Sequence, residues 1–460
     1  GQGMKNNIQV SINKKMISLT VERMVMYKQT KVIELKNKNG YYYYGVFYKD
    51  QFINIAKAKK IKLHSYMHQA LKNGITFDRD HPLTTQLLSN TNKFFSIKFN
   101  QLFQNLQKTY PLADITFIFQ FFDSFTKKGS SQKILKNTFY ELRRNGKNLK
   151  AYQLLKMYLN YAPTDRFAKD MIQHIDFQRQ EMTYANIESI LEKDPDYVEA
   201  ICFDDRLQTT ALELLYQIYR KQQRTLDELA VRLDVIIHHY STVHLKEIEK
   251  LLSTRSVEDQ VYILHSLSKK IENNEIDQLL FKKLLDLNDS NQLVQFIMEK
   301  QYQPTNEQIS LITHHFNQAD KDVLSSYFRI ANKRLLQLSN EEGKMLEKMV
   351  SPFVFSFMEN YNLMDILDWF EVFHQANITL PIEKKLKRMQ MYKEDPDQQL
   401  ALGELYLDFK QFEKSIDCFK WEMEINPDNT KAVSYLTKVY RKLGNVEEAN
   451  VYQQLLKKMG

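Results

Sequence analysis

The chain has 460 residues, of which 43% are hydrophobic and 26% are charged, and its net charge is +8. This composition supports a large core and excludes an intrinsically disordered chain. The sequence contains only 11 Gly and 9 Pro, and no Gly lies between Gly146 and Gly343. A glycine-rich loop that binds phosphate or a dinucleotide is therefore excluded from that segment.

Cysteine content and hydropathy bear on the cellular compartment. Cys202 and Cys418 are the only cysteines, and no CxxC pair is present, which excludes a disulfide framework and a cysteine-based zinc site. The apolar stretch at 115–122 is far shorter than the roughly 20 residues that a membrane helix needs. Residues 1–3 resemble a cloning remnant, and no apolar signal-peptide core follows Met4. We therefore expect a cytoplasmic protein without a membrane span.

Residues 4–75 are predicted to form a basic, β-rich module. Short runs of β-branched and aromatic residues predict strands that are confined to about the first 65 residues. The clearest element is a hairpin in which 31–36 and 41–48 flank a turn at 37–40. The pair Asn39-Gly40 supplies the positive φ angles that such a turn requires.

The second strand of this hairpin carries a run of aromatic residues. Alternation sends Tyr42 and Tyr44 to one face and Tyr43 and Phe47 to the other. One face belongs to the core, and the other is either covered by helices or is an exposed platform on which bases stack. The residues of this candidate nucleic-acid site are Lys36, Lys38, Tyr42, Tyr44 and Lys49.

Charge is distributed unevenly along the chain. Residues 1–150 contain 26 Lys and Arg but 8 Asp and Glu, a net charge of +18, and residues 151–460 carry −10. Such asymmetry indicates either an anionic partner for the basic end, most often nucleic acid, or charge complementarity within the chain. The sequence leaves both explanations open.

Helices are predicted for nearly all of the remaining chain. Residues 76–131 are predicted to be a helical connector, and from Pro82 onward no strand is expected. Capping boxes, in which Ser or Thr precedes Glu or Gln by three residues, predict the starts of three helices. These pairs are Thr225/Glu228, Thr305/Gln308 and Ser339/Glu342.

A 34-residue period is present in 391–460. Three pairs of equivalent positions, one apolar, one aromatic and one small, are separated by this period: Leu402/Leu436, Tyr406/Tyr440 and Ser415/Ala449. Together with Gly403, Phe419 and Pro427, these positions resemble the tetratricopeptide repeat family. Its unit is a helix–turn–helix with small residues where the two helices cross, because small side chains let antiparallel helices approach closely.

The same resemblance extends, more loosely, to 132–199. With Pro163 as the closing proline, the positions in register within 132–165 are Leu142, Gly146, Ala151, Leu155 and Tyr158. Residues 200–390 are helical but out of register. The resemblance implies a mostly α fold, a tetratricopeptide-like α-solenoid in which helical hairpins form a right-handed superhelix, preceded by the small basic β-containing module.

No catalytic or metal site is predicted. His64 and His68 have the i, i+4 spacing of two metal ligands on one helix face, but no third ligand is near them. The nucleophile motif GxSxG is absent. Residues 225–252 resemble a helix-turn-helix, but the turn is about three residues too long, so an ordinary helical hairpin is predicted. We expect a protein that is not an enzyme and that uses no cofactor.

The resemblance implies a scaffold or adaptor that binds a protein or peptide on the concave face of the solenoid. Basic residues at helical spacing on the first helix of two repeats either form a solvated surface, as on most helices, or hold an acidic peptide or a C-terminal carboxylate. These candidate peptide-binding residues are Lys133, Lys136, Tyr140, Arg143, Lys431, Ser434, Lys438 and Arg441. The alternative is a nucleic-acid-binding regulator that uses the basic N-terminal module for contact and the helical repeats as a sensor.

Overall fold

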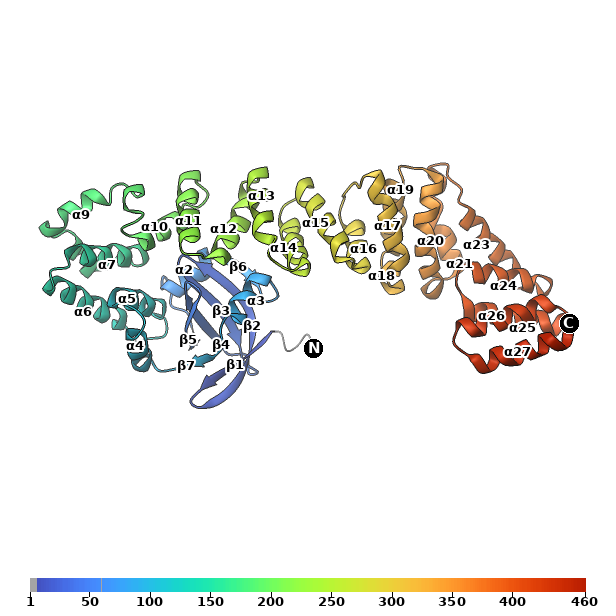
Figure 1. The fold of residues 1–460 in the computed structure, drawn as a ribbon, viewed down its shortest axis with the longest axis horizontal. Helices are drawn as coiled ribbons and strands as arrows, with labels where there is room; N and C mark the ends of the chain where they lie inside the picture. The colour runs from blue at the N-terminus through green and yellow to red at the C-terminus, as the bar shows by residue number, and fades with distance from the viewer. Residues whose placement is uncertain (1–5, 59) are drawn as a thin grey trace. The chain divides into compact units, whose positions relative to one another are not determined.

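The computed structural model describes residues 6–58 and 60–460, and it consists of an N-terminal sheet followed by helices (Figure 1). The chain divides into two compact units, Gly1–Ile276 and Asp277–Gly460, which we call the N-terminal and the C-terminal unit. The predicted cloning remnant at residues 1–3 lies outside the described residues. In the part that is described, no helix is both long and apolar enough to cross a membrane.

The sheet lies in the N-terminal unit and curls until its two edge strands meet. Its strands are β1 (Asn7–Ile12), β2 (Lys15–Tyr27), β3 (Thr30–Lys36), β4 (Tyr42–Tyr48), β5 (Gln51–Ala58), β6 (Ile75–Asp78) and β7 (Phe94–Ser96). The order across the sheet is β5-β4-β3-β2-β1-β7, and β6 pairs with β2 beside β1. At the meeting edges, the Ser96 hydroxyl donates to the Ile55 carbonyl at 2.6 Å, and Asn54 exchanges side-chain hydrogen bonds with the backbone of Ile97.

The predicted hairpin is confirmed as β3 and β4. Gly40 has a φ of +86°, a conformation that residues with a Cβ avoid. The side-chain oxygen of Asn37 accepts hydrogen bonds from the backbone N–H groups of Asn39 and Tyr41. Of the predicted pair, Gly40 has the positive φ and Asn39 does not, and the side chain that holds the turn is that of Asn37.

The prediction that strands end near residue 65 is wrong. β6 at 75–78 pairs with Arg23–Met26 of β2, and β7 at 94–96 lies parallel to β1. β7 has only three residues, so its local sequence is too short to show alternation, and its strand conformation comes from pairing with a distant segment. The sheet therefore reaches into the predicted helical connector at 76–131, which also contains helices.

Short helices cover the sheet: α2 (Tyr66–Asn73), α3 (Pro82–Ser89), α4 (Phe99–Gln107) and α5 (Leu112–Phe121). Phe47 of β4 packs edge-on against Phe94 of β7, with ring centroids 6.5 Å apart. On the other face, Tyr48 lies 6.2 Å from Phe121 of α5. Most of the aromatic run of β4 is thus enclosed rather than displayed.

Helices make up nearly all of the remaining chain, and many of them pack against the next helix in the sequence. Those of the N-terminal unit are α6 (Ser130–Arg144), α7 (Asn148–Tyr161), α8 (Arg166–Ile172), α9 (Gln178–Thr183), α10 (Pro195–Asp204), α11 (Thr209–Lys221), α12 (Thr225–His238), α13 (Thr242–Leu252) and α14 (Val257–Lys270), with α15 (Asn274–Leu287) at the division between the units. Those of the C-terminal unit are α16 (Ser290–Glu299), α17 (Asn306–Gln318), α18 (Lys321–Ser325), α19 (Phe328–Leu338), α20 (Gly343–Asn360), α21 (Leu363–Trp369), α22 (Glu371–Gln375), α23 (Pro381–Tyr392), α24 (Gln399–Asp408), α25 (Phe412–Ile425), α26 (Thr430–Lys442) and α27 (Val446–Met459).

Several interhelix turns share one backbone geometry. In each of them, a residue with positive φ follows the end of the first helix. The backbone N–H of the residue after it donates to the carbonyl five positions earlier, and this bond satisfies a carbonyl that the helix leaves free. The positive-φ residues of these turns are Gly146, Gln223, Asn340, Asn377, Lys410 and Gly444. Lys410 and Gly444 lie at the same place in two hairpins one 34-residue period apart, so the period is visible in the backbone as well as in the sequence.

The two hairpins α24–α25 and α26–α27 occupy the segment where the 34-residue period was found. Ser415 and Ala449, the predicted small crossing positions, are fully buried. Gly403 faces the ring of Phe419 so closely that a Cβ on Gly403 would lie 2.5 Å from the ring atom Cε1. Small residues therefore set the distance between these helices, as the pattern predicted.

One predicted capping box is confirmed and two are wrong. Thr305 and Gln308 cap α17 reciprocally, with both hydrogen bonds formed. Thr225 is already the first helical residue of α12, so its side chain does not cap that helix. Ser339 ends α19, and Glu342 itself caps α20 through its carboxylate. The N-cap residues are Arg224 and Glu342, one and three residues from the predicted Thr225 and Ser339.

Candidate functional site

Three of the five predicted nucleic-acid contacts lie near the turn between β3 and β4. The Lys36 ammonium is 5.6 Å from the centre of the Tyr42 ring. Tyr42 keeps 41% of its surface exposed, and Lys38 is exposed in the turn. These three side chains therefore form one small surface.

The other two predicted contacts lie elsewhere. Tyr44 is buried, and its hydroxyl donates to the Glu34 carboxylate at 3.3 Å. Burial, with Glu34 beside it, raises the pKa of Tyr44. The Lys49 ammonium lies 3.3 Å from the carboxylate of Asp196 on α10. Tyr44 thus has no free face for stacking, and the charge of Lys49 is engaged within the chain.

The turn between β2 and β3 is buried against the helices of the same unit. Lys28 is 1% exposed, donates to the Asn160 side chain at 2.6 Å and lies 3.2 Å from the Asp204 carboxylate. Burial lowers the pKa of Lys28, and Asp204 opposes that shift. Next to it, Gln29 accepts a hydrogen bond from the Tyr161 hydroxyl at 2.6 Å. Lys28 and Gln29 are polar residues of a kind that usually lies in exposed turns, but in this turn both side chains are buried.

A buried ionic cluster, made of Lys31, Glu199, Arg224 and Asp227, continues this contact. Lys31 pairs with Asp227, and Arg224 donates to Asp227 at 2.6 Å and to Glu199 at 2.9 Å. Burial would lower the pKa of Arg224, but the two carboxylates raise it well above its ordinary value. Burial also raises the pKa of Glu199, against the effect of Arg224. The four groups hold β3 to α10 and to the start of α12, where Arg224 is the N-cap residue.

These contacts settle part of the question that the charge asymmetry raised. Lys28, Lys31 and Lys49 belong to the basic segment, and each pairs with an acid from the helices that follow. Some of the N-terminal positive charge is therefore neutralised within the chain. Sequence analysis missed this cluster because its members are separated by up to about 200 residues and form no local motif.

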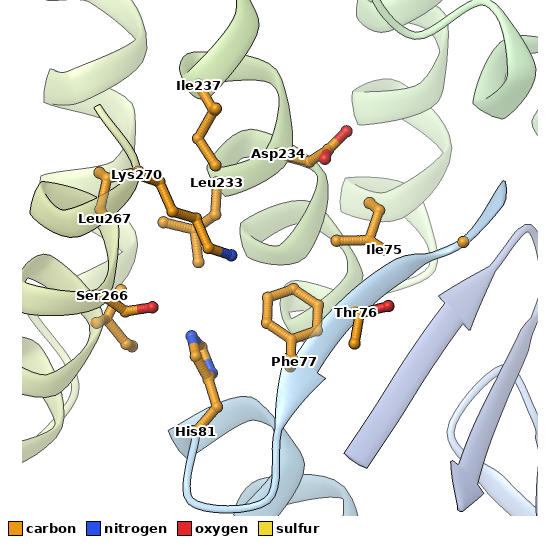
Figure 2. Close-up of a pocket in the computed structure, with 12 residues that line it drawn as sticks. Ile75, Thr76, Phe77, His81, Leu233, Asp234, Ile237, Ser266, Leu267 and Lys270 are labelled. Carbon is orange, nitrogen blue, oxygen red and sulfur yellow. The ribbon is translucent and has the colours of Figure 1, made fainter. Parts of the chain in front are cut away.

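A pocket of about 230 Å³ lies between β6 and α3 on one side and α12 and α14 on the other. Figure 2 shows the imidazole of His81, the hydroxyl of Ser266 and the ammonium of Lys270 directed toward a common space beside the Phe77 ring. The carboxylate of Asp234 points away from that space, and Arg206 binds it at 2.8 Å. The polar end of the pocket is thus made of hydrogen-bond donors and one cation.

His81 is fixed in the pocket wall by its role as the N-cap of α3. Its Nδ1 accepts the backbone N–H of Leu83 at 3.1 Å, so the proton of the neutral ring is on Nε2. Burial, together with the charges of Lys270 and Arg255, lowers the pKa of His81 to about 4 although Asp78 opposes the shift. At neutral pH the ring is uncharged and offers one N–H donor. Nothing in the sequence distinguished His81, since its partners come from a helix nearly 190 residues later.

The candidate peptide-binding residues on α6 are largely engaged by their neighbours. The Lys136 ammonium lies 5.3 Å from the Phe167 ring centre, and Arg143 donates to Asp176 at 2.8 Å. Tyr140 is half exposed beside Phe167. Lys133 is exposed. Lys133, Lys136 and Tyr140 are exposed and Arg143 is partly exposed, so this set faces solvent, but Lys136 and Arg143 already have contacts within the chain.

The candidate residues on α26 form what we call the basic face: Lys431, Ser434, Lys438 and Arg441. Lys431, Lys438 and Arg441 are exposed and Ser434 is half-buried. The opposite face of α26 is buried. The Arg441 guanidinium bonds to the Gln453 side chain of α27, whereas Lys431 and Lys438 form no ion pair with any described residue. The basic face therefore carries positive charge that is available to a partner.

The described residues define a mostly helical protein with an N-terminal curled sheet, and within them no cluster of three His, Cys, Asp or Glu side chains is arranged to hold a metal ion. Neither a scan of protein-family models nor a search of curated proteins gives a match for this chain. The resemblance to tetratricopeptide repeats therefore stays a prediction from the sequence.

Proposed function

We propose that this chain is a non-enzymatic, cytoplasmic scaffold or adaptor that binds a protein or peptide on a tetratricopeptide-like solenoid of helical hairpins. The observation that carries the proposal is the basic face of α26. Its two lysines are exposed without an internal partner, while Lys28, Lys31 and Lys49 of the N-terminal module pair with acids of the same chain. The ammonium groups of Lys431 and Lys438 are therefore accessible to a binding partner.

The chemistry of the basic face favours an acidic peptide or a free C-terminal carboxylate. Lys431, Ser434 and Lys438 follow one another at spacings of three and four residues, so their side chains line one stripe of the helix. A carboxylate held by such a stripe accepts charge-assisted hydrogen bonds, each contributing about 1.5–3 kcal/mol. The α6 set is a weaker candidate because Lys136 and Arg143 already have contacts.

Reversing the charge of the basic face is expected to abolish partner capture. We expect the double variant Lys431→Glu/Lys438→Glu to lose proteins that the unaltered chain recovers from a cell lysate, since a carboxylate ligand would be repelled rather than bound. The measurement is a pull-down with both baits, followed by mass spectrometry of the proteins recovered. A peptide from a recovered protein, titrated against both baits, then gives the loss of affinity directly.

The matched control is Lys457→Glu/Lys458→Glu, which makes the same charge change on exposed lysines of α27. This control should recover the same proteins as the unaltered chain. Identical recovery by all three baits would mean that the basic face is only solvated surface, and the proposal for this face would then be withdrawn.

A second candidate function, nucleic-acid binding, is favoured by one observation. Tyr41 and Tyr42 remain exposed at the end of β4, with the Lys57 ammonium 4.4 Å from the Tyr41 ring centre and Lys36 beside Tyr42. If this surface stacks on bases, oligonucleotide affinity should fall steeply as salt rises, because phosphate contacts release counterions. The double variant Lys36→Glu/Tyr42→Ala should then bind at least about tenfold more weakly. Two results would argue for the scaffold function alone. One is that the double variant binds oligonucleotides as tightly as the unaltered chain. The other is that the purified protein contains no nucleic acid by absorbance and binds no oligonucleotide.

A further inference from the structure

The pocket between β6, α3, α12 and α14 has the features of a small-molecule site. Phe77, Leu233 and Leu267 give it an apolar wall, and His81, Ser266 and Lys270 form its polar end (Figure 2). We propose that it binds a small organic anion, with a carboxylate at His81, Ser266 and Lys270 and an apolar body against Phe77. The pocket shares no residue with the basic face of α26, so this proposal does not depend on the scaffold function.

The polar end is suited to a carboxylate rather than to a cation or a neutral group. Lys270 is an exposed residue at the end of α14, and its ammonium reaches the pocket and forms no ion pair with the described residues. Neutral His81 and Ser266 each supply one donor. Of the acids near the pocket, Asp234 is bound by Arg206, and Asp78 accepts a hydrogen bond from Tyr262 at 2.7 Å. The bond from Tyr262 leaves Asp78 negatively charged, and that charge raises the pKa of His81 against the larger effect of burial. Asp78 does not line the pocket, however, whereas the Lys270 ammonium is directed into it.

The interior of the pocket is of a size that suits a small metabolite. The pocket volume of about 230 Å³ equals the liquid volume of roughly eight water molecules. It lies below the range of about 300–1,000 Å³ that is usual for pockets that bind drug-sized ligands. A monocarboxylate with one ring or a short chain fits this volume. Such a ligand would contact β6 and α3 as well as α12 and α14, and so would join the sheet to the helices that follow it.

Calorimetric titration of the full chain with phenylacetate and with hexanoate tests the proposal. We expect saturable binding of at least one of these probes, and about tenfold or more weaker binding by Lys270→Met, because the ammonium makes a charge-assisted hydrogen bond. Lys269→Met is the matched control, since Lys269 is exposed on the same helix but does not line the pocket. Its affinity should stay within about twofold of the unaltered chain. Phenylacetamide, the uncharged analogue, should bind more weakly than phenylacetate.

The imidazole of His81 gives an independent readout at the site. Its pKa of about 4 should rise when an anion binds beside it, because negative charge stabilises the protonated ring. The measurement is an NMR titration of the histidine Cε1–H signals with and without phenylacetate. The variant His81→Asn, which keeps an N-cap acceptor, assigns the signal.

Three results would overturn the proposal: no saturable binding of either carboxylate, equal affinity of Lys270→Met and the unaltered chain, or equal binding of phenylacetamide. An unchanged pKa of His81 with phenylacetate bound would place the ligand elsewhere, and the assignment of this pocket would then be wrong.

Discussion

Replacement of Arg224 by methionine is expected to destabilise the N-terminal unit by about 3–5 kcal/mol, the usual result of removing one partner of a buried ion pair. Arg224 is 4% exposed and binds two carboxylates that are themselves fully buried, Glu199 and Asp227. Without the guanidinium, Glu199 loses its cation and Asp227 retains only Lys31. The measurement is urea unfolding followed by far-UV circular dichroism, which senses the helices of both units.

The control for this prediction is Arg220→Met, one turn earlier on α11. The Arg220 side chain is 57% exposed and pairs with the part-exposed Glu247 and with the buried Glu228. Glu228 keeps Arg232 as a second cation, so loss of Arg220 leaves no buried carboxylate of this pair without a cation. Exposed pairs contribute about 0–1 kcal/mol, since water screens them. If Arg224→Met lowers the free energy of unfolding no more than Arg220→Met does, the buried ionic cluster does not hold the sheet to the helices.

Sequence patterns predicted the elements that depend on residues close together in the chain. The β3–β4 hairpin follows from Asn39-Gly40, and the C-terminal hairpins follow from the 34-residue period. The shared interhelix turn was harder to find, because Gln223 and Lys410 adopt the positive φ angle that glycine usually marks. At these positions the packing of the two helices imposes a conformation that the residue itself disfavours.

Features that depend on distant segments could not be predicted. Lys28 and Lys31 flank a short turn between two apolar strands, a pattern typical of an exposed hairpin. Their burial depends on acids about 175–200 residues later, and a single sequence gives no signal for such pairs. The pocket has the same origin, since His81 and Lys270 approach each other only in the folded unit. The candidate residues on α6 and α26 lie on helices, as predicted, because helical spacing is a local property; their role in binding stays a prediction.

Replacement of Gly403 by valine is expected to destabilise the C-terminal unit by about 3 kcal/mol, the upper end of the usual cost of overpacking a core. A Cβ at this position would lie 2.5 Å from Cε1 of Phe419, and the ring of Phe419 is fully buried between α24 and its neighbours. Neither side chain can move away without separating the two helices of the hairpin. Both tryptophans, Trp369 and Trp421, lie in the C-terminal unit, so urea unfolding followed by tryptophan fluorescence reports on that unit.

Two further variants separate a clash with Phe419 from a general loss of glycine. Gly343→Val is the matched control, because no atom lies within 4 Å of a Cβ at that position, and its effect should stay within about 0.5 kcal/mol. In a chain that already carries Phe419→Ala, the ring is absent. Adding Gly403→Val to that chain should lower the free energy of unfolding only a little further. If Gly403→Val costs the same with and without the Phe419 ring, close approach of α24 and α25 is not the reason for the glycine. The small residues of the 34-residue period would then need another explanation than helix packing.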